Sequence, residues 1–121
     1  CYKARAEAVR HAEVYRGAFA ISVCPSENVE SPTIVGAQAA NELLNIIGIK
    51  ASFVLTEYNG KIYISSRSID EINVQLIMER LGGGGHLNVA GAQLKDCTIV
   101  QAKHAIMDTL DEMLKEGDIQ E

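Results

Sequence analysis

The sequence predicts an α/β (α+β) fold in which helices pack on a mixed β-sheet of about four to five strands. Three observations support this prediction. Segments with helical spacing of apolar residues alternate along the chain with segments in which every second residue is apolar. An Asn-Gly pair at 59–60 separates two apolar runs, which is a strong β-hairpin pattern. A length of 121 residues, with 47% hydrophobic and 22% charged residues, suits one globular domain.

The N-terminal residues predict a helix followed by a strand. Residues 2–15 are rich in Ala, Glu and Arg, but their apolar face is thin. A helix that buries so little is interpreted as the end of a linker, so we assign residues 1–16 to a linker helix from another domain and residues 17–121 to the domain itself. Because the chain starts at Cys1 rather than at a Met, we expect it to be a fragment of a longer protein. Residues 18–24 alternate in the manner of a strand.

The central part predicts a helix and a hairpin. Ser31-Pro32 is typical of a helix start, with Ser as N-cap, and Gly48 marks the end of that helix near residue 47. Its polar residues form one narrow stripe, so most of the helix is expected to pack across a sheet. Two strands, 50–57 and 61–67, flank the hairpin turn.

The C-terminal half predicts two more helices and a short strand. Ser68 and Glu71 have the spacing of a capping box. The helix expected after them has an apolar side formed by Ile72, Leu76, Ile77 and Leu81. A short strand is expected at 90–95, and the last helix at about 99–115.

Charge and cysteine content narrow the class of protein. A net charge of −5 argues against a duplex nucleic-acid binder but allows a small phosphorylated ligand in a local pocket. Cys1, Cys24 and Cys97 are widely spaced and form no Cys-x-x-Cys pair, which favours a reducing compartment. The sequence has neither an apolar run long enough for a membrane span nor a signal peptide.

A run of four glycines before His86 is the main candidate site. Gly83, Gly84 and Gly85 could let a phosphate approach the backbone and bind to converging N–H groups, while His86 donates a proton or a hydrogen bond. Arg67, at the end of the second hairpin strand, could clamp the same phosphate. The alternatives are a flexible turn for the glycines and, for the arginine, a surface residue lying over a tyrosine.

Other polar residues near this site have weaker indications. Ser65 and Ser68 could add hydroxyl donors, although helix capping already accounts for Ser68. Asn73 and Gln75 could contact a base edge or could simply be solvated. The acidic residues are scattered, so no metal site is predicted. The spacing after the glycines fits neither a P-loop nor a dinucleotide fingerprint.

These motifs resemble a known family. The segments Ile64-Ser65-Ser66-Arg67-Ser68, Asn73-Val74-Gln75, Gly82-Gly83-Gly84-Gly85-His86 and Ala90-Gly91-Ala92-Gln93 resemble the DHH-associated C-terminal domain of DHH-family phosphoesterases. Segments 51–55 and 73–81 are similar to the branch of GdpP-type cyclic di-AMP phosphodiesterases.

The resemblance implies that two domains of one protein share the reaction. A separate N-terminal DHH domain would bind two metal ions, usually manganese, while this domain presents the nucleotide. The parent protein would hydrolyse cyclic di-AMP to linear di-adenylate, and it would be anchored in the membrane with this part in the cytoplasm. Arg67, Ser68, Asn73 and the segment Gly83–Gly85 would grip the substrate, and His86 would bind it and support catalysis. The chain alone, without a cofactor of its own, is expected to bind but not to hydrolyse.

Several alternatives stay open. The chain could be a non-catalytic nucleotide-binding or sensing module, or a nucleic-acid-binding domain of a RecJ-like or oligoribonuclease-type protein. An RNA-binding domain like that appended to alanyl-tRNA synthetase would need a more basic surface. A homodimer built through residues 1–16 and the last helix is also considered. The sequence upstream of the chain would separate the enzyme from the sensing module.

Overall fold

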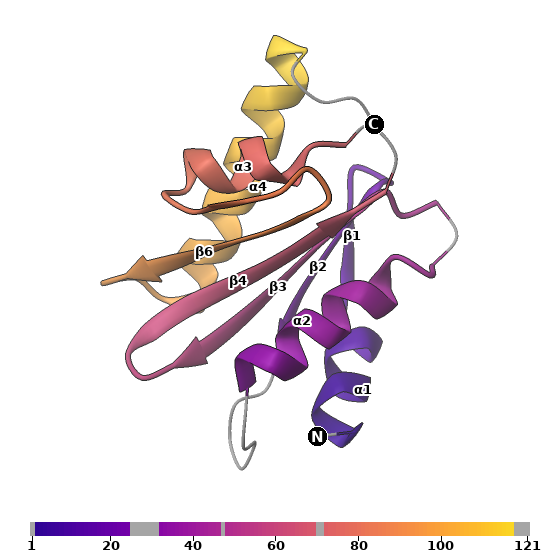
Figure 1. The fold of residues 1–121 in the computed structure, drawn as a ribbon, viewed down its shortest axis with the longest axis vertical. Coiled ribbons are helices and arrows are strands. Elements are labelled where there is room, and N and C mark those ends of the chain that lie inside the picture. The colour runs from indigo at the N-terminus through magenta and orange to yellow at the C-terminus, as the bar shows by residue number, and fades with distance from the viewer. Residues whose placement is uncertain (1, 25–31, 47, 70–71, 118–121) are drawn as a thin grey trace.

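The computed structural model describes residues 2–24, 32–46, 48–69 and 72–117. In these residues six strands form one sheet in the order β1-β2-β3-β4-β6-β5, and four helices pack on it (Figure 1). The strands are β1 Glu13–Tyr15, β2 Phe19–Cys24, β3 Ala51–Tyr58, β4 Lys61–Ser68, β5 Gly84–Gly85 and β6 Val89–Lys95. The helices are α1 Tyr2–Arg10, α2 Pro32–Leu43, α3 Val74–Arg80 and α4 Ile99–Glu116.

The sheet is mixed, as expected, but has six strands instead of four to five. Only β2 and β3 are paired in parallel, across the α2 connection, while the other neighbours are antiparallel. A parallel pair needs such a crossover, whereas a hairpin turn suffices for an antiparallel one. The α/β prediction is therefore confirmed.

The helices cover both faces of the sheet (Figure 1). One apolar cluster joins α1 and α2 to β2 and β3, with Leu43 and Val54 among its buried residues. The larger cluster joins α3 and α4 to the other face, around Phe53, Ile77 and Leu110. Alternation along the strands sends successive side chains into different clusters.

The predicted N-terminal helix is too long. It ends at Arg10, and Glu13–Tyr15 forms the edge strand β1 beside β2. Helix α4 holds this strand: the Tyr15 hydroxyl donates to Asp111 Oδ1 at 2.7 Å, and Lys103 Nζ donates to Glu13 Oε1 at 2.7 Å. Contacts distant in sequence thus override the local preference for helix.

The central elements follow the prediction closely. The hairpin turns at Asn59 and Gly60, whose φ angles of 53° and 75° suit a type I′ turn. Helix α2 ends at Leu43, before the predicted end, and the next residues form a tighter turn in which Asn45 N donates to Glu42 O at 3.0 Å. Ser31, predicted as the N-cap, lies outside the described residues.

The capping box predicted after the hairpin is wrong. Ser68 is the buried last residue of β4, and the N-cap of α3 is Asn73, whose Oδ1 accepts from Leu76 N at 3.2 Å. Glu71, the other half of the predicted box, lies outside the described residues. Because the helix starts later, its buried side consists of Val74, Ile77 and Met78, and Leu76, predicted to be inside, is 42% exposed.

The last helix agrees with its prediction. It spans Ile99–Glu116, with a capping box between Thr98 and Gln101 and a left-handed Gly117 at its end. Ala102, Ile106, Leu110 and Met113 form its buried stripe.

Candidate functional site

The glycine run is the outer arm of a tight hairpin at one edge of the sheet. Strand β5 pairs with β6 through Gly84 opposite Gly91. Beyond the strand, His86 N donates to Val89 O at 2.7 Å and Val89 N donates to His86 O at 3.4 Å, so these two residues also face each other. On the other side of β6, Val89 pairs with Arg67 of β4. Arg67, Val89 and His86 therefore form one row across the sheet.

The side chains of this row share one face. Ile62 and Ile64 of β4 pack into the cluster under α3 and α4. Because successive strand residues alternate, Arg67 projects from the opposite face, on the side of α2, and so do its cross-strand neighbour Val89 and, by pairing, His86. Two strand spacings separate Arg67 from His86, which is about 10 Å between Cα atoms. The structure thus brings the arginine and the histidine to one surface.

Arg67 is a half-buried cation. Its Nη1 donates to Ser66 O at 2.8 Å, and burial lowers the pKa of the guanidinium from its ordinary value. Among the described residues no carboxylate pairs with it. A guanidinium has five N–H donors and stays charged at neutral pH. A partly desolvated charge with donors to spare favours an anion from outside the chain.

Packing explains two of the glycines. A Cβ added to Gly83 would lie 2.1 Å from the Gly91 carbonyl oxygen, and one added to Gly85 would lie 2.5 Å from the Ala90 Cα. Gly85 also has φ +146°, a conformation that L side chains rarely adopt. A Cβ on Gly84, by contrast, would meet no atom of the described chain within 4 Å. The fold therefore leaves the absence of a side chain at Gly84 unexplained.

Two backbone N–H groups of the run are used within the fold. Gly83 N donates to Met78 O at 2.8 Å, which closes the end of α3, and His86 N donates to Val89 O across the hairpin. These two amides are therefore less available for the phosphate cradle predicted at Gly83–Gly85, which stays a prediction. Among the described residues the His86 imidazole has no hydrogen-bond partner.

Ser68 and Asn73 are not brought to the Arg67 surface. Ser68 lies on the opposite face of β4, where its Oγ donates to Ile72 O at 2.6 Å and accepts from Asn88 Nδ2 at 2.9 Å. It ties the segment after β4 to the turn that carries His86. The Asn73 side-chain oxygen caps α3, and Gln75 Nε2 donates to Glu79 at 3.4 Å.

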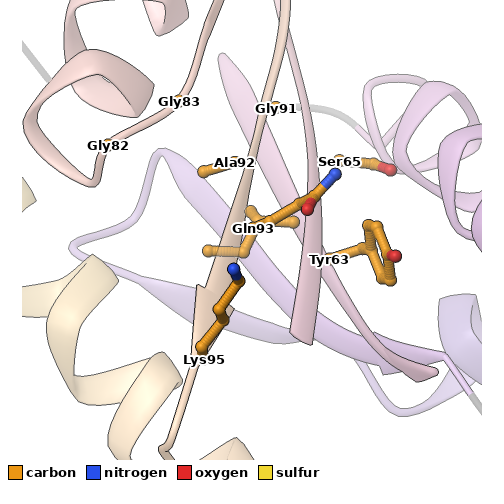
Figure 2. Close-up of a pocket in the computed structure, with 9 residues that line it drawn as sticks. Tyr63, Ser65, Gly82, Gly83, Gly91, Ala92, Gln93 and Lys95 are labelled. Carbon is orange, nitrogen blue, oxygen red and sulfur yellow. The ribbon is translucent and has the colours of Figure 1, made fainter. Parts of the chain in front are cut away.

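A cavity of about 490 Å³ adjoins the arginine row (Figure 2). It is lined by Tyr63, Ile64, Ser65, Gly82, Gly83, Gly91, Ala92, Gln93 and Lys95. Ser65 and Gly91 pair with each other. On this face of the sheet they form the row nearest to that of Arg67 and Val89. Of the residues considered for the site, only Gly83 and Ser65 line the cavity.

Sequence reasoning offered Ser65 as a hydroxyl donor but missed three of the lining side chains as site residues: Tyr63, Gln93 and Lys95. The period of two along β4 already placed Tyr63 and Ser65 on the Arg67 face. The two residues of β6 join them only through the pairing of Tyr63 with Gln93 and of Lys61 with Lys95. That register depends on the paired strands and cannot be read from β6 alone.

The open face of β4 and β6 carries positive charge without a compensating acid. Its residues are Lys61, Tyr63, Ser65 and Arg67 on β4, and Val89, Gly91, Gln93 and Lys95 on β6. Neither lysine makes an ion pair within the described part of the chain. In a chain with net charge −5 this acid-free strip is a local concentration of positive charge.

The ligands of a metal centre are not found here. No group of three or more His, Cys, Asp or Glu side chains that could hold a metal ion exists among the described residues. The side chains of the strip, basic and amide groups, do not fit a metal ion either. Within the same part of the chain, no helix has the length and apolar character needed to cross a bilayer.

Two proteins named as cyclic-di-AMP phosphodiesterases are similar in sequence to this chain. The chain is 44% identical over 108 residues to the cyclic-di-AMP phosphodiesterase PdeA of Listeria monocytogenes, covering 88% of this chain and 16% of that protein. It is 38% identical over 117 residues to the cyclic-di-AMP phosphodiesterase GdpP of Geobacillus thermodenitrificans, covering 96% of this chain and 18% of that protein. The chain thus spans less than a fifth of the length of these two relatives.

A solved structure and a family model agree with these relatives. The crystal structure of an exopolyphosphatase-related protein from Bacteroides fragilis superposes with a TM-score of 0.80 at 22% identity, over 93% of this chain and 34% of that one. At this identity the likeness concerns the fold alone. Residues 18–116 match the model of the DHHA1 domain. The chain therefore belongs to the DHHA1 domain family.

Proposed function

We propose that this chain binds cyclic di-AMP or linear di-adenylate on the open face of β4 and β6, as the substrate-binding part of a phosphodiesterase. The observation that carries the proposal is Arg67, a half-buried cation with no acidic partner among the described residues, in one row with His86 and beside a cavity of about 490 Å³. The names of the PdeA and GdpP relatives support the choice of ligand.

Each residue of the site has a distinct part in this proposal. Arg67 binds phosphate oxygens through paired N–H donors. Gly84 lets the ligand approach the edge strand, since no side chain stands there. His86 donates to a phosphate oxygen and supports the departure of the leaving oxygen, for which an imidazole is suited near neutral pH. Ser68 and Asn73 position the turn and α3 through hydrogen bonds within the chain.

Hydrolysis is assigned to another part of the parent protein. No group of described residues could hold a metal ion, so activation of the attacking water is assigned to that other part. In the proposal a DHH domain precedes residue 17, provides the two manganese ions and is linked by residues 1–16, and the parent is membrane-anchored with these domains in the cytoplasm. Strand β1 joins the sheet and Ala8 of α1 is buried in the cluster under α2, so the proposed linker also packs against the folded unit.

The first test is the affinity of the chain for the nucleotide. Replacing Arg67 by Ala should weaken binding of linear di-adenylate or cyclic di-AMP by about 1.5–3 kcal/mol, as for a charged hydrogen bond. Titration calorimetry would measure both proteins under the same salt conditions. Arg10→Ala is the matched control, since Arg10 is an exposed arginine that pairs with Glu7 on α1. Equal affinities of the wild type and Arg67→Ala would contradict the proposal.

A further inference from the structure

We infer that the cavity beside Arg67 is a nucleobase subsite, in which Tyr63 packs against the base and Gln93 binds its polar edge. The inference rests on the proposed function, because it takes the phosphate to lie at Arg67. It places the base at residues other than Asn73 and Gln75, which the sequence had offered as contacts to a base edge.

The spacing of the rows suits one nucleotide. Tyr63 pairs with Gln93, so the two stand side by side on neighbouring strands. They lie four residues along the strands from the pair of Arg67 and Val89, which is about 14 Å between Cα positions. An extended arginine side chain reaching along the face, together with a ribose, can span that gap. A volume of about 490 Å³ is in the range of small-molecule sites.

Tyr63 provides the aromatic surface. Its ring packs near that of Tyr58, with centroids 6.5 Å apart and an interplanar angle of 50°. This tilted arrangement supports the ring without stacking one flat face on the other. Tyr58 itself is 41% exposed. Bases of any kind stack on such aromatic side chains, because each base has a π face.

Gln93 provides the hydrogen bonds. Its side chain is exposed, and its carboxamide has no hydrogen-bond partner among the residues that the structure describes. Figure 2 shows it on the same side of the sheet as Tyr63 and Ser65. A carboxamide offers one donor and one acceptor in a plane, which matches the amino group and ring nitrogen on an adenine edge.

Other amides of the chain are worse placed for this role. Asn73 uses its side-chain oxygen to cap α3. Gln75 is bonded to Glu79 on the same helix. Asn73 caps α3 and Gln75 belongs to it; this helix packs on the face opposite to Arg67, and neither residue lines the cavity.

The test compares a ligand with bases to one without. Linear di-adenylate and its abasic counterpart, which has the same sugar-phosphate backbone, are titrated into the chain by calorimetry. Tyr63→Leu and Gln93→Ala should each weaken di-adenylate binding by about fivefold or more and leave the abasic ligand unaffected. Tyr63→Phe, which keeps the ring, should bind di-adenylate like the wild type, and Gln75→Ala is the control for the amide.

The outcomes separate this inference from the proposed function. Equal binding of di-adenylate and the abasic ligand by the wild type would show that the base subsite is wrong. So would a loss of affinity for both ligands in Tyr63→Leu and in Tyr63→Phe. In either case the phosphate site stands. Arg67→Ala should weaken both ligands. If it weakens neither, the proposed function itself fails, and the base subsite with it.

Discussion

Arg67 and Ser68 are neighbours in sequence, yet they lie on opposite faces of β4. The alternation along the strand predicts that Arg67 faces away from Ile62 and Ile64, and the structure confirms it. The role of Ser68 could not be predicted, because its partner Asn88 is twenty positions away and meets it only in the folded chain. The sequence alone therefore predicts a helix cap for Ser68, because the capping pattern is local and the hydrogen bond to Asn88 is not.

The glycines give the most selective test at the scale of single residues. Gly84→Val should leave the thermal stability of the chain nearly unchanged, because the added Cβ has no described atom within 4 Å, and should weaken di-adenylate binding by roughly tenfold or more through collision with the ligand. Gly83→Val is the comparison, since its side chain would collide with the Gly91 carbonyl and destabilise the fold by about 3 kcal/mol or more. Thermal unfolding and calorimetry measure the two effects. Undiminished binding by Gly84→Val would refute close approach of the ligand at this position.

Among the elements, the long ones were predictable and the short edge strands were not. The hairpin of β3 and β4 and the helix α4 have strong local patterns, and their predicted bounds are close to those observed. Strands β1 and β5, of three and two residues, have no periodicity to detect. Each exists because a neighbouring strand offers hydrogen-bonding partners. The start of α3 was displaced for the same reason, since the segment before it is held by the β5–β6 turn.

The packing of α2 on the sheet depends on a close contact at one glycine. A Cβ on Gly36 would lie 2.6 Å from Thr56 Oγ1 of β3. Gly36→Ala should therefore lower the free energy of unfolding, by about 1 kcal/mol, because overpacking outweighs the better helix propensity of Ala. In a Thr56→Ala background the same change should be neutral or stabilising. Urea unfolding of the four proteins measures this coupling, and an equal effect of Gly36→Ala in both backgrounds would rule out the contact as its cause.

At the scale of the whole molecule, the N-terminal segment is fastened to the C-terminal helix. The Tyr15 hydroxyl and Arg16 Nε both donate to Asp111 Oδ1 at 2.7 Å. These hydrogen bonds, from Tyr15 first and then from Arg16, lower the pKa of the Asp111 carboxyl. No local pattern in residues 2–15 indicates this attachment, and the sequence therefore predicts a linker helix there.

The attachment predicts a pH dependence of stability. Because the pKa of Asp111 is lower in the folded chain, its contribution is complete above its unfolded pKa of about 4 and is lost as pH falls through the folded value. Asp111→Asn should cost up to about 1 kcal/mol at pH 7, since the pair is partly exposed. The difference from the wild type should shrink toward pH 2–3. Urea unfolding at several pH values measures it, with Asp108→Asn on the same helix as control. A difference that does not depend on pH would disprove the assignment.

The two ends of the sheet have a consequence for assembly. The borders of the described sheet are strands of three and two residues, and they pair with only Phe19–Ile21 of β2 and Ala90–Gly91 of β6. The outer side of β6 from Gln93 to Lys95 therefore has no described strand beside it and offers backbone on which another polypeptide could add a strand. Lys95 lies in this stretch, and a charged side chain at a sheet edge disfavours uncontrolled strand addition and fibril growth.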